Sequence, residues 1–119
     1  MAPVTRIELP VRRRGVCSDL PAAPDEAWSQ RQSSLLKALA DPTRLSMLAA
    51  LHRASAPVCI CDFTAAYDLS QPTISHHMAK LRAAGLVESS RRGIWVYYQL
   101  RSDMTGEVRR LLHAALAIG

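Results

Sequence analysis

Two cysteines separated by one residue, Cys59 and Cys61, are the most chemically distinctive pair in the sequence. Thiolates are ligands of soft metal ions. Residues two apart diverge by about 200° in an α-helix but point to the same side of an extended segment. The pair lies just ahead of Asp62, which we expect to cap a helix, so the chain can be extended at the cysteines and both sulfurs can converge. On the residues alone, a ligand pair and two small buried side chains remain alternatives.

The electrostatic surroundings of this pair favour the ligand form of cysteine. A helix N-terminus and nearby basic residues lower the pKa of a thiol, and the thiolate is the form that binds metal. We therefore expect lowered thiol pKa values at Cys59 and Cys61, with Ile60 between them turned into the core.

The segment 70–84 carries side chains suited to reading DNA. Ile74, Met78 and Leu81 recur at helical spacing and predict a helix with one face in the core, with Ser70 as its N-cap. Recognition in the major groove requires short hydrogen-bonding side chains, whereas an ordinary solvent-exposed face usually carries Glu and Lys pairs. The candidate DNA-contacting residues on the outer face are Gln71, Thr73, Ser75, His76, His77 and Lys80.

The elements expected ahead of this helix complete a helix-turn-helix. Apolar periodicity predicts helices over 25–40 and 42–54, the second of them capped by Asp41. A brief helix capped by Asp62 then precedes the helix at 70–84 and braces it.

A β-hairpin is expected directly after the recognition helix. The apolar period changes to two, which predicts strands over 86–90 and 94–100 joined by a turn at 91–93. Such a hairpin is a wing, and we expect Arg91 and Arg92 at its tip to contact the sugar-phosphate backbone or the minor groove. A solubilising turn is the alternative. A last helix is predicted over 102–118.

These elements predict a mainly α, α+β winged helix-turn-helix with about five helices and a β-hairpin wing. Residues 1–24 predict a flexible N-terminal arm, and residues 25–119 a winged helix-turn-helix DNA-binding domain with terminal dimerisation helices. Those terminal helices carry more apolar surface than so small a core covers. Two recognition helices must also lie about 34 Å apart on a two-fold site. We expect a homodimer on double-stranded operator DNA.

Composition agrees with a DNA-binding protein inside the cell. The chain has 119 residues and a net charge of +5, with a pI near 9.6, which favours a polyanionic partner. It has no apolar run of about 20 residues, as a membrane span requires, and no signal peptide, so we expect a cytoplasmic protein without a membrane partner. Three cysteines argue against a disulfide framework.

Four motifs together resemble the ArsR/SmtB family of winged-helix metal-sensing repressors. They are the segments 36–45 (Leu-Lys-Ala-Leu-Ala-Asp-Pro-Thr-Arg-Leu), 59–62 (Cys-Ile-Cys-Asp), 69–87 with its Ser-Gln-Pro-Thr-Ile-Ser-His-His, and 92–98 (Arg-Gly-Ile-Trp-Val-Tyr-Tyr). The resemblance implies a dimeric repressor that releases its operon when an inducer binds. It also implies that Gln71, Thr73, Ser75, His76 and His77 face DNA, and it favours Cys59 and Cys61 as ligands.

The sensory site departs from the family's patterns. Thr64 stands where the plasmid arsenic sensors have a third cysteine, and the arm has Cys17 alone where cadmium and lead sensors have two. The zinc site of the last helix is absent, since Met104 and Thr105 follow Asp103 where a histidine is needed. Cys17 is therefore the candidate third thiolate.

Three thiolates suit trigonal-pyramidal As(III) or Sb(III) better than a tetrahedral ion. Cd(II) or Pb(II) completed by another ligand is an alternative inducer, and reversible disulfide formation is another. A thiol enzyme is disfavoured because the chain lacks a Cys-x-x-Cys motif and a general base beside a cysteine. A constitutive architectural DNA-binding protein would bind DNA and ignore metals.

Overall fold

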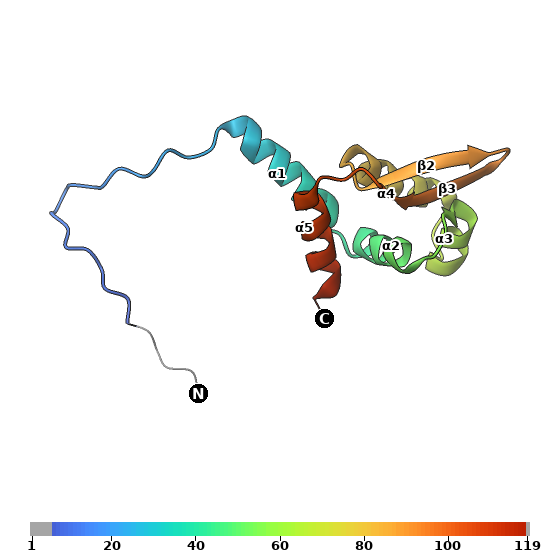
Figure 1. Ribbon diagram of the computed structural model, residues 1–119, viewed down its shortest axis with the longest axis horizontal. Coiled ribbons are helices and arrows are strands. Elements are labelled where there is room, and N and C mark those ends of the chain that lie inside the picture. The colour runs from blue at the N-terminus through green and yellow to red at the C-terminus, as the bar shows by residue number, and fades with distance from the viewer. Residues whose placement is uncertain (1–5, 119) are drawn as a thin grey trace.

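The computed structural model describes residues 6–118, so residues 1–5 of the predicted arm and residue 119 lie outside the described residues. Residues 6–25 contain no helix or strand, and Figure 1 shows them extending away from the folded body. Within residues 6–118, every helix falls short of the length and apolarity needed for a membrane span. The elements in chain order are α1 (Glu26–Leu39), α2 (Pro42–Arg53), β1 (Val58–Cys59), α3 (Ile60–Tyr67), α4 (Gln71–Ala83), β2 (Val87–Arg92), β3 (Trp95–Leu100) and α5 (Gly106–Ala117).

Local capping explains where the helices begin. The carboxylate of Asp25 accepts a hydrogen bond from the backbone N–H of Trp28 at 2.8 Å, and Asp41 accepts one from Arg44 at 2.9 Å. Ser70 does the same for Thr73 at 3.3 Å. Each bond satisfies a backbone donor that has no partner within its helix. The predicted starts of α1, α2 and α4 are therefore confirmed.

The helix-turn-helix is formed by α3 and α4. Asp68 turns the chain between them with a left-handed φ of 51°, a conformation that Asp tolerates better than most residues. The predicted stripe of Ile74, Met78 and Leu81 is fully buried. It packs in one core with residues of α2, α3, the sheet and the turn before β2, including Met47, Leu48, Phe63, Leu86 and Val87.

The wing contains a third strand that the sequence analysis missed. Strands β2 and β3 pair antiparallel from Val87↔Leu100 to Arg92↔Trp95. β1 adds to the other side of β3, so the strand order is β1-β3-β2. The turn also differs from the prediction: β2 continues through Arg92, and the two-residue loop is Gly93-Ile94. Gly93 has a φ of 60°, which glycine adopts without steric cost in a tight hairpin turn.

In the view of Figure 1, α1 and α5 are both drawn at the end of the folded body opposite the tip of the wing. Leu112 is the fully buried residue of α5, while α1 buries Ala38 and Leu39 at its end. Trp28 and Leu36 on α1 are about half exposed, at 45% and 52%. The five helices and the winged helix-turn-helix observed within residues 6–118 confirm the predicted fold class.

Candidate thiolate site and nucleic-acid interface

The sulfur atoms of Cys59 and Cys61 lie 2.9 Å apart, with the Cys61 thiol donating to the Cys59 sulfur. Cys59 is buried at the end of β1, and Cys61 is exposed in the first turn of α3. The sulfurs converge as expected, but the extended segment predicted for both cysteines ends at Cys59. The pair meets because Cys59 keeps extended dihedrals as the N-cap while Cys61 is already helical. Ile60 between them is buried, as expected.

Asp62 does not cap α3, so this expectation is wrong. The N-cap is Cys59, three residues earlier, and the Asp62 carboxylate accepts a hydrogen bond from the backbone N–H of Cys59 at 3.3 Å. An acidic side chain at this third helical position reaches back to the N-cap backbone, as in a capping box. Its second oxygen lies 3.9 Å from the Cys61 sulfur, so a carboxylate accompanies the thiol pair.

The expected lowering of the thiol pKa is wrong for Cys61. Its pKa is raised above the usual 9.0, first because its thiol donates a hydrogen bond to Cys59. Partial desolvation and the electrostatic influence of Cys59 and Asp62 act in the same direction. Each of these effects favours the protonated thiol. Cys61 is therefore a neutral thiol near pH 7, and a ligand that binds it must displace its proton.

Cys17 does not lie with this pair. It is exposed in the extended segment that precedes α1. Among residues 6–118, no three His, Cys, Asp or Glu side chains cluster in a way that would hold a metal ion. Two sulfurs each about 2.3 Å from one ion at a tetrahedral angle lie about 3.8 Å apart, so Cys59 and Cys61, at 2.9 Å, need to separate by only about 1 Å to serve as two ligands of one soft ion.

The predicted DNA-reading residues are spread around α4 from the side facing the wing, at Gln71 and Ser75, to the side facing Arg44, at His77. Gln71, Thr73, His76 and Lys80 are exposed, whereas Ser75 and His77 are partly buried. Thr73 also has a structural role, because its hydroxyl lies 2.8 Å from that of the N-cap Ser70. This hydroxyl is therefore less free for base contact than the other side chains.

A polar cleft of about 410 Å³ separates α4 from the wing. Arg91 lines it, and Arg92 is exposed one residue further along β2. The cleft also contains Arg82, which the sequence analysis missed; its guanidinium donates to the Ser89 hydroxyl at 3.0 Å. Arg82 lies seven residues after Ser75, so helical periodicity could have placed it on the same face. Ile60 lines the cleft too and joins it to the cysteine pair. The remaining lining residues are Gln71, Ser75, Ser90, Val96 and Tyr98.

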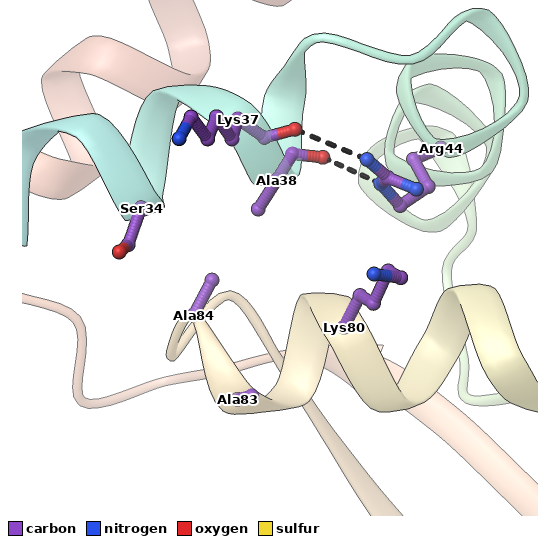
Figure 2. A pocket seen from close by; sticks show the side chains of 7 residues that line it. All are labelled: Ser34, Lys37, Ala38, Arg44, Lys80, Ala83 and Ala84. Atoms are coloured by element: carbon purple, nitrogen blue, oxygen red, sulfur yellow. Dashed lines mark hydrogen bonds between the residues drawn. The ribbon is translucent and has the colours of Figure 1, made fainter.

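A second cavity, of about 330 Å³, lies between α1 and α4. Figure 2 shows the guanidinium of Arg44 at one side of it, against the backbone carbonyls of Lys37 and Ala38. The two hydrogen bonds measure 3.0 Å to Lys37 and 2.7 Å to Ala38. Lys80 extends from α4 on the facing wall (Figure 2), so cationic side chains line both walls of this cavity.

The arrangement of α3, α4 and the three-stranded wing defines a winged helix-turn-helix protein. The chain belongs to the ArsR family of bacterial regulatory proteins: residues 41–89 match the family described as bacterial regulatory protein, arsR family. Because this is a family of transcriptional regulators, the expectation that the chain is not an enzyme is confirmed.

Individual relatives agree with this assignment. The chain is 42% identical over 78 residues to an arsenic resistance transcriptional regulator of Pseudomonas putida, covering 66% of this chain and 60% of that one. It is 38% identical to the arsenical resistance operon repressor of Escherichia coli over 68% of each chain. A homodimeric winged helix-turn-helix DNA-binding domain from Mycobacterium bovis, a possible ArsR-family regulator, has a TM-score of 0.63 at 27% identity, covering 80% of this chain and 85% of that one.

Proposed function

We propose that this chain is a metalloid-responsive transcriptional repressor. It binds operator DNA as a homodimer and is released when As(III) or Sb(III) binds Cys59, Cys61 and Cys17. Two relatives named for arsenic resistance support the choice of inducer. The chain spans 60% of the length of the first of them.

The proposal depends chiefly on where the two converging sulfurs lie. Cys59 pairs with Tyr97 in the wing sheet, and Cys61 belongs to the first helix of the helix-turn-helix. Ile60 between them lines the cleft that separates wing and recognition helix. A ligand that changes the separation of these sulfurs therefore acts on both DNA-binding elements at once.

The DNA interface combines two kinds of contact. Gln71, Ser75, His76 and His77 supply short polar groups for base edges in the major groove. Basic side chains contact phosphates, which adds affinity without sequence information. This second set comprises Lys80 on α4 and Arg91 and Arg92 on the wing, with Arg82 in the cleft between them.

The exposed apolar residues of the terminal helices support a homodimer. Trp28 and Leu36 are large, apolar and half exposed on α1, and Ile118, directly after α5, is exposed as well. The structural relative from M. bovis is described as homodimeric. A two-fold dimer places two α4 helices in successive major grooves of one operator.

Proton balance favours a metalloid hydroxide over a divalent cation. Arsenite is the neutral As(OH)₃ near pH 7, and each thiol that replaces one hydroxide forms an As–S bond and releases one water. The thiol proton leaves within that water, so the raised pKa of Cys61 is no obstacle. Cd(II) or Pb(II) must instead expel the proton into solution. Both remain alternative inducers, with Asp62 as an available carboxylate.

The close approach of the two sulfurs also favours a second candidate, a redox-responsive repressor. A peroxide would oxidise two thiols by two electrons to a disulfide, becoming water and alcohol or two waters. Cys59 and Cys61, or either of them with Cys17, would be the partners.

Whichever inducer acts, DNA binding weakens only if the inducer binds, or the disulfide forms, more favourably in the conformation with low affinity for DNA. A coupling of about 3 kcal/mol corresponds to roughly 100-fold weaker operator binding.

The test begins by selecting duplexes from a randomised DNA pool with the purified full-length protein. The selected duplex is then titrated with As(III), Sb(III), Cd(II), Pb(II) and Zn(II), and with peroxide in a separate arm. Release by As(III) or Sb(III) at the lowest concentrations supports the proposal. Release only by a divalent ion or by peroxide assigns the alternative inducer. Failure to select any sequence would contradict the DNA-binding part itself.

A further inference from the structure

Arg44 connects the end of α1 to the recognition helix. Its side chain is 12% exposed, and two of its nitrogens donate to the Lys37 and Ala38 carbonyls (Figure 2). These carbonyls belong to the last turn of α1, where helix acceptors lack internal partners. The interactions hold the guanidinium in one orientation.

The remaining nitrogen of the guanidinium faces a histidine on α4. Nη1 of Arg44 lies 3.4 Å from Nδ1 of His77 and 3.8 Å from the Asp41 carboxylate. An arginine side chain has donors only and stays protonated in proteins. In this contact Arg44 must therefore donate, and Nδ1 of His77 must accept without a proton of its own.

A neutral imidazole carries its single proton on one ring nitrogen, and the partner of one nitrogen determines the state of the other. With Nδ1 as acceptor, the proton of His77 lies on Nε2. Within residues 6–118, no partly or fully buried side chain has a buried N or O atom without a hydrogen-bond partner. The hydrogen bond described for the His77 ring uses Nδ1. Nε2 is thus at least partly exposed to solvent.

We propose that Arg44 is a positioning residue that fixes the tautomer of His77, so that α4 offers DNA an Nε2–H donor. The proposal rests on the DNA-reading role proposed for α4. A donor requires an acceptor, which on DNA is either a base edge, such as guanine O6 or N7, or a phosphate oxygen. Arg44 would in this way affect operator recognition without touching DNA.

The first test measures the tautomer in the free full-length protein. Two-bond ¹H–¹⁵N correlation spectra at pH 8 distinguish protonated from unprotonated imidazole nitrogens. We expect His77 to show an unprotonated Nδ1 and a protonated Nε2. A protonated Nδ1, or an even mixture of the tautomers, would overturn the proposal without any variant being made.

Variants then assign the effect to Arg44. Arg44→Gln is expected to leave His77 as a mixture of tautomers, and Arg44→Met, whose side chain has no donor, serves the same purpose if the glutamine variant does not fold. Arg82→Gln is the matched control, because Arg82 also lies beside the DNA-reading face but donates to Ser89 instead. An unchanged His77 spectrum in a folded Arg44 variant would overturn the proposal.

The second test uses the duplex selected by the parent protein. We expect Arg44→Gln to weaken binding roughly 5- to 10-fold, about the loss of one hydrogen bond, but to have little effect when His77 is already alanine. Equal losses in both backgrounds would mean that Arg44 acts independently of His77. If His77→Ala changes the selected sequence, the acceptor is a base; if it weakens all sequences equally, the acceptor is a phosphate. If the parent protein selected no DNA, the proposed function would be contradicted, whereas the tautomer measured in the free protein would still hold.

Discussion

Cys59 and Cys61 bring their sulfurs to 2.9 Å across the junction between a strand and a helix. The first cysteine is paired in the wing sheet, and the second belongs to the helix-turn-helix. A change in the distance between these two atoms is therefore a change between the two elements that would grip DNA.

Replacing either cysteine of the pair should abolish the response to arsenite. Cys59→Ser or Cys61→Ser removes a soft sulfur ligand and substitutes a hard oxygen, so we expect arsenite to release DNA at concentrations at least about tenfold higher, if at all. Cys17→Ser tests the third ligand separately. Fluorescence anisotropy of a labelled duplex measures the release. Parent-like release in both pair variants would show that the inducer binds elsewhere.

The response to divalent ions should depend on pH more strongly than the response to arsenite. The raised pKa of Cys61 keeps its thiol protonated near pH 7, so Cd(II) must displace a proton. The affinity for Cd(II) should fall about tenfold for each unit by which the pH is lowered, for every proton displaced. Arsenite binding releases water and should change little. Thiolate–metal absorbance titrations at pH 6 and pH 8 compare them, and equally steep slopes would contradict the proton balance proposed above.

Removing a wing arginine should weaken DNA binding in a salt-dependent way. The slope of log affinity against log salt concentration is negative. Arg91→Gln or Arg92→Gln is expected to reduce its magnitude by about 1 for a lost phosphate contact. Arg101→Gln is the control, because Arg101 is exposed but paired with Asp103 at 2.8 Å. Affinities between 50 and 300 mM salt provide the measurement. A slope equal to that of the control would mean that Arg91 and Arg92 do not contact DNA and only make the turn soluble.

Charge on an α1 residue should convert the protein to a monomer. Leu36→Glu places a carboxylate in the proposed dimer surface, where burial of an unpaired charge is costly. Val11→Glu is the control, since Val11 is fully exposed on the arm. Sedimentation velocity should show a monomer for the first variant and a dimer for the second. If the Leu36→Glu protein remained a dimer, Leu36 would not lie in the dimer interface.

Asp41 should make stability depend on pH in the acid range. The backbone N–H of Arg44 is the largest cause that holds its pKa below the usual 3.8. A carboxyl with a lower pKa in the folded state contributes stability above its unfolded pKa and loses it as pH falls through the folded value. Asparagine caps helices without titrating. The difference in melting temperature between the parent and Asp41→Asn should therefore shrink from pH 7 to pH 2. A difference that stays constant would rule out this role.

Local sequence signals predicted the helix-turn-helix well. At α4 a cap at Ser70, a core stripe of Ile74, Met78 and Leu81, and a stop near Gly85 all agree, and each acts within a few residues. The same rules misplaced the start of α3. An acidic residue near a helix start can be the N-cap or the third helical residue, and the chain around Asp62 does not distinguish these positions.

Two features of the site depend on contacts that sequence patterns do not record. β1 consists of Val58 and Cys59, too short to show a period of two, and its partners lie about 40 positions further along the chain. Arg44 reaches His77 across 33 positions. Both contacts exist because the core brings α2, α4 and the sheet together, so they follow from tertiary packing.

The small size of β1 bears on reversibility. It holds to β3 through two residue pairs, whereas β2 and β3 share six. Each backbone hydrogen bond contributes only about 1 kcal/mol, so detaching β1 costs an amount close to the usual energy of allosteric coupling, 1–3 kcal/mol. Under the proposed function, an inducer at Cys59 would thus loosen this edge while the β2–β3 hairpin stays paired. Once the inducer is gone, the same chain can bind DNA again without refolding.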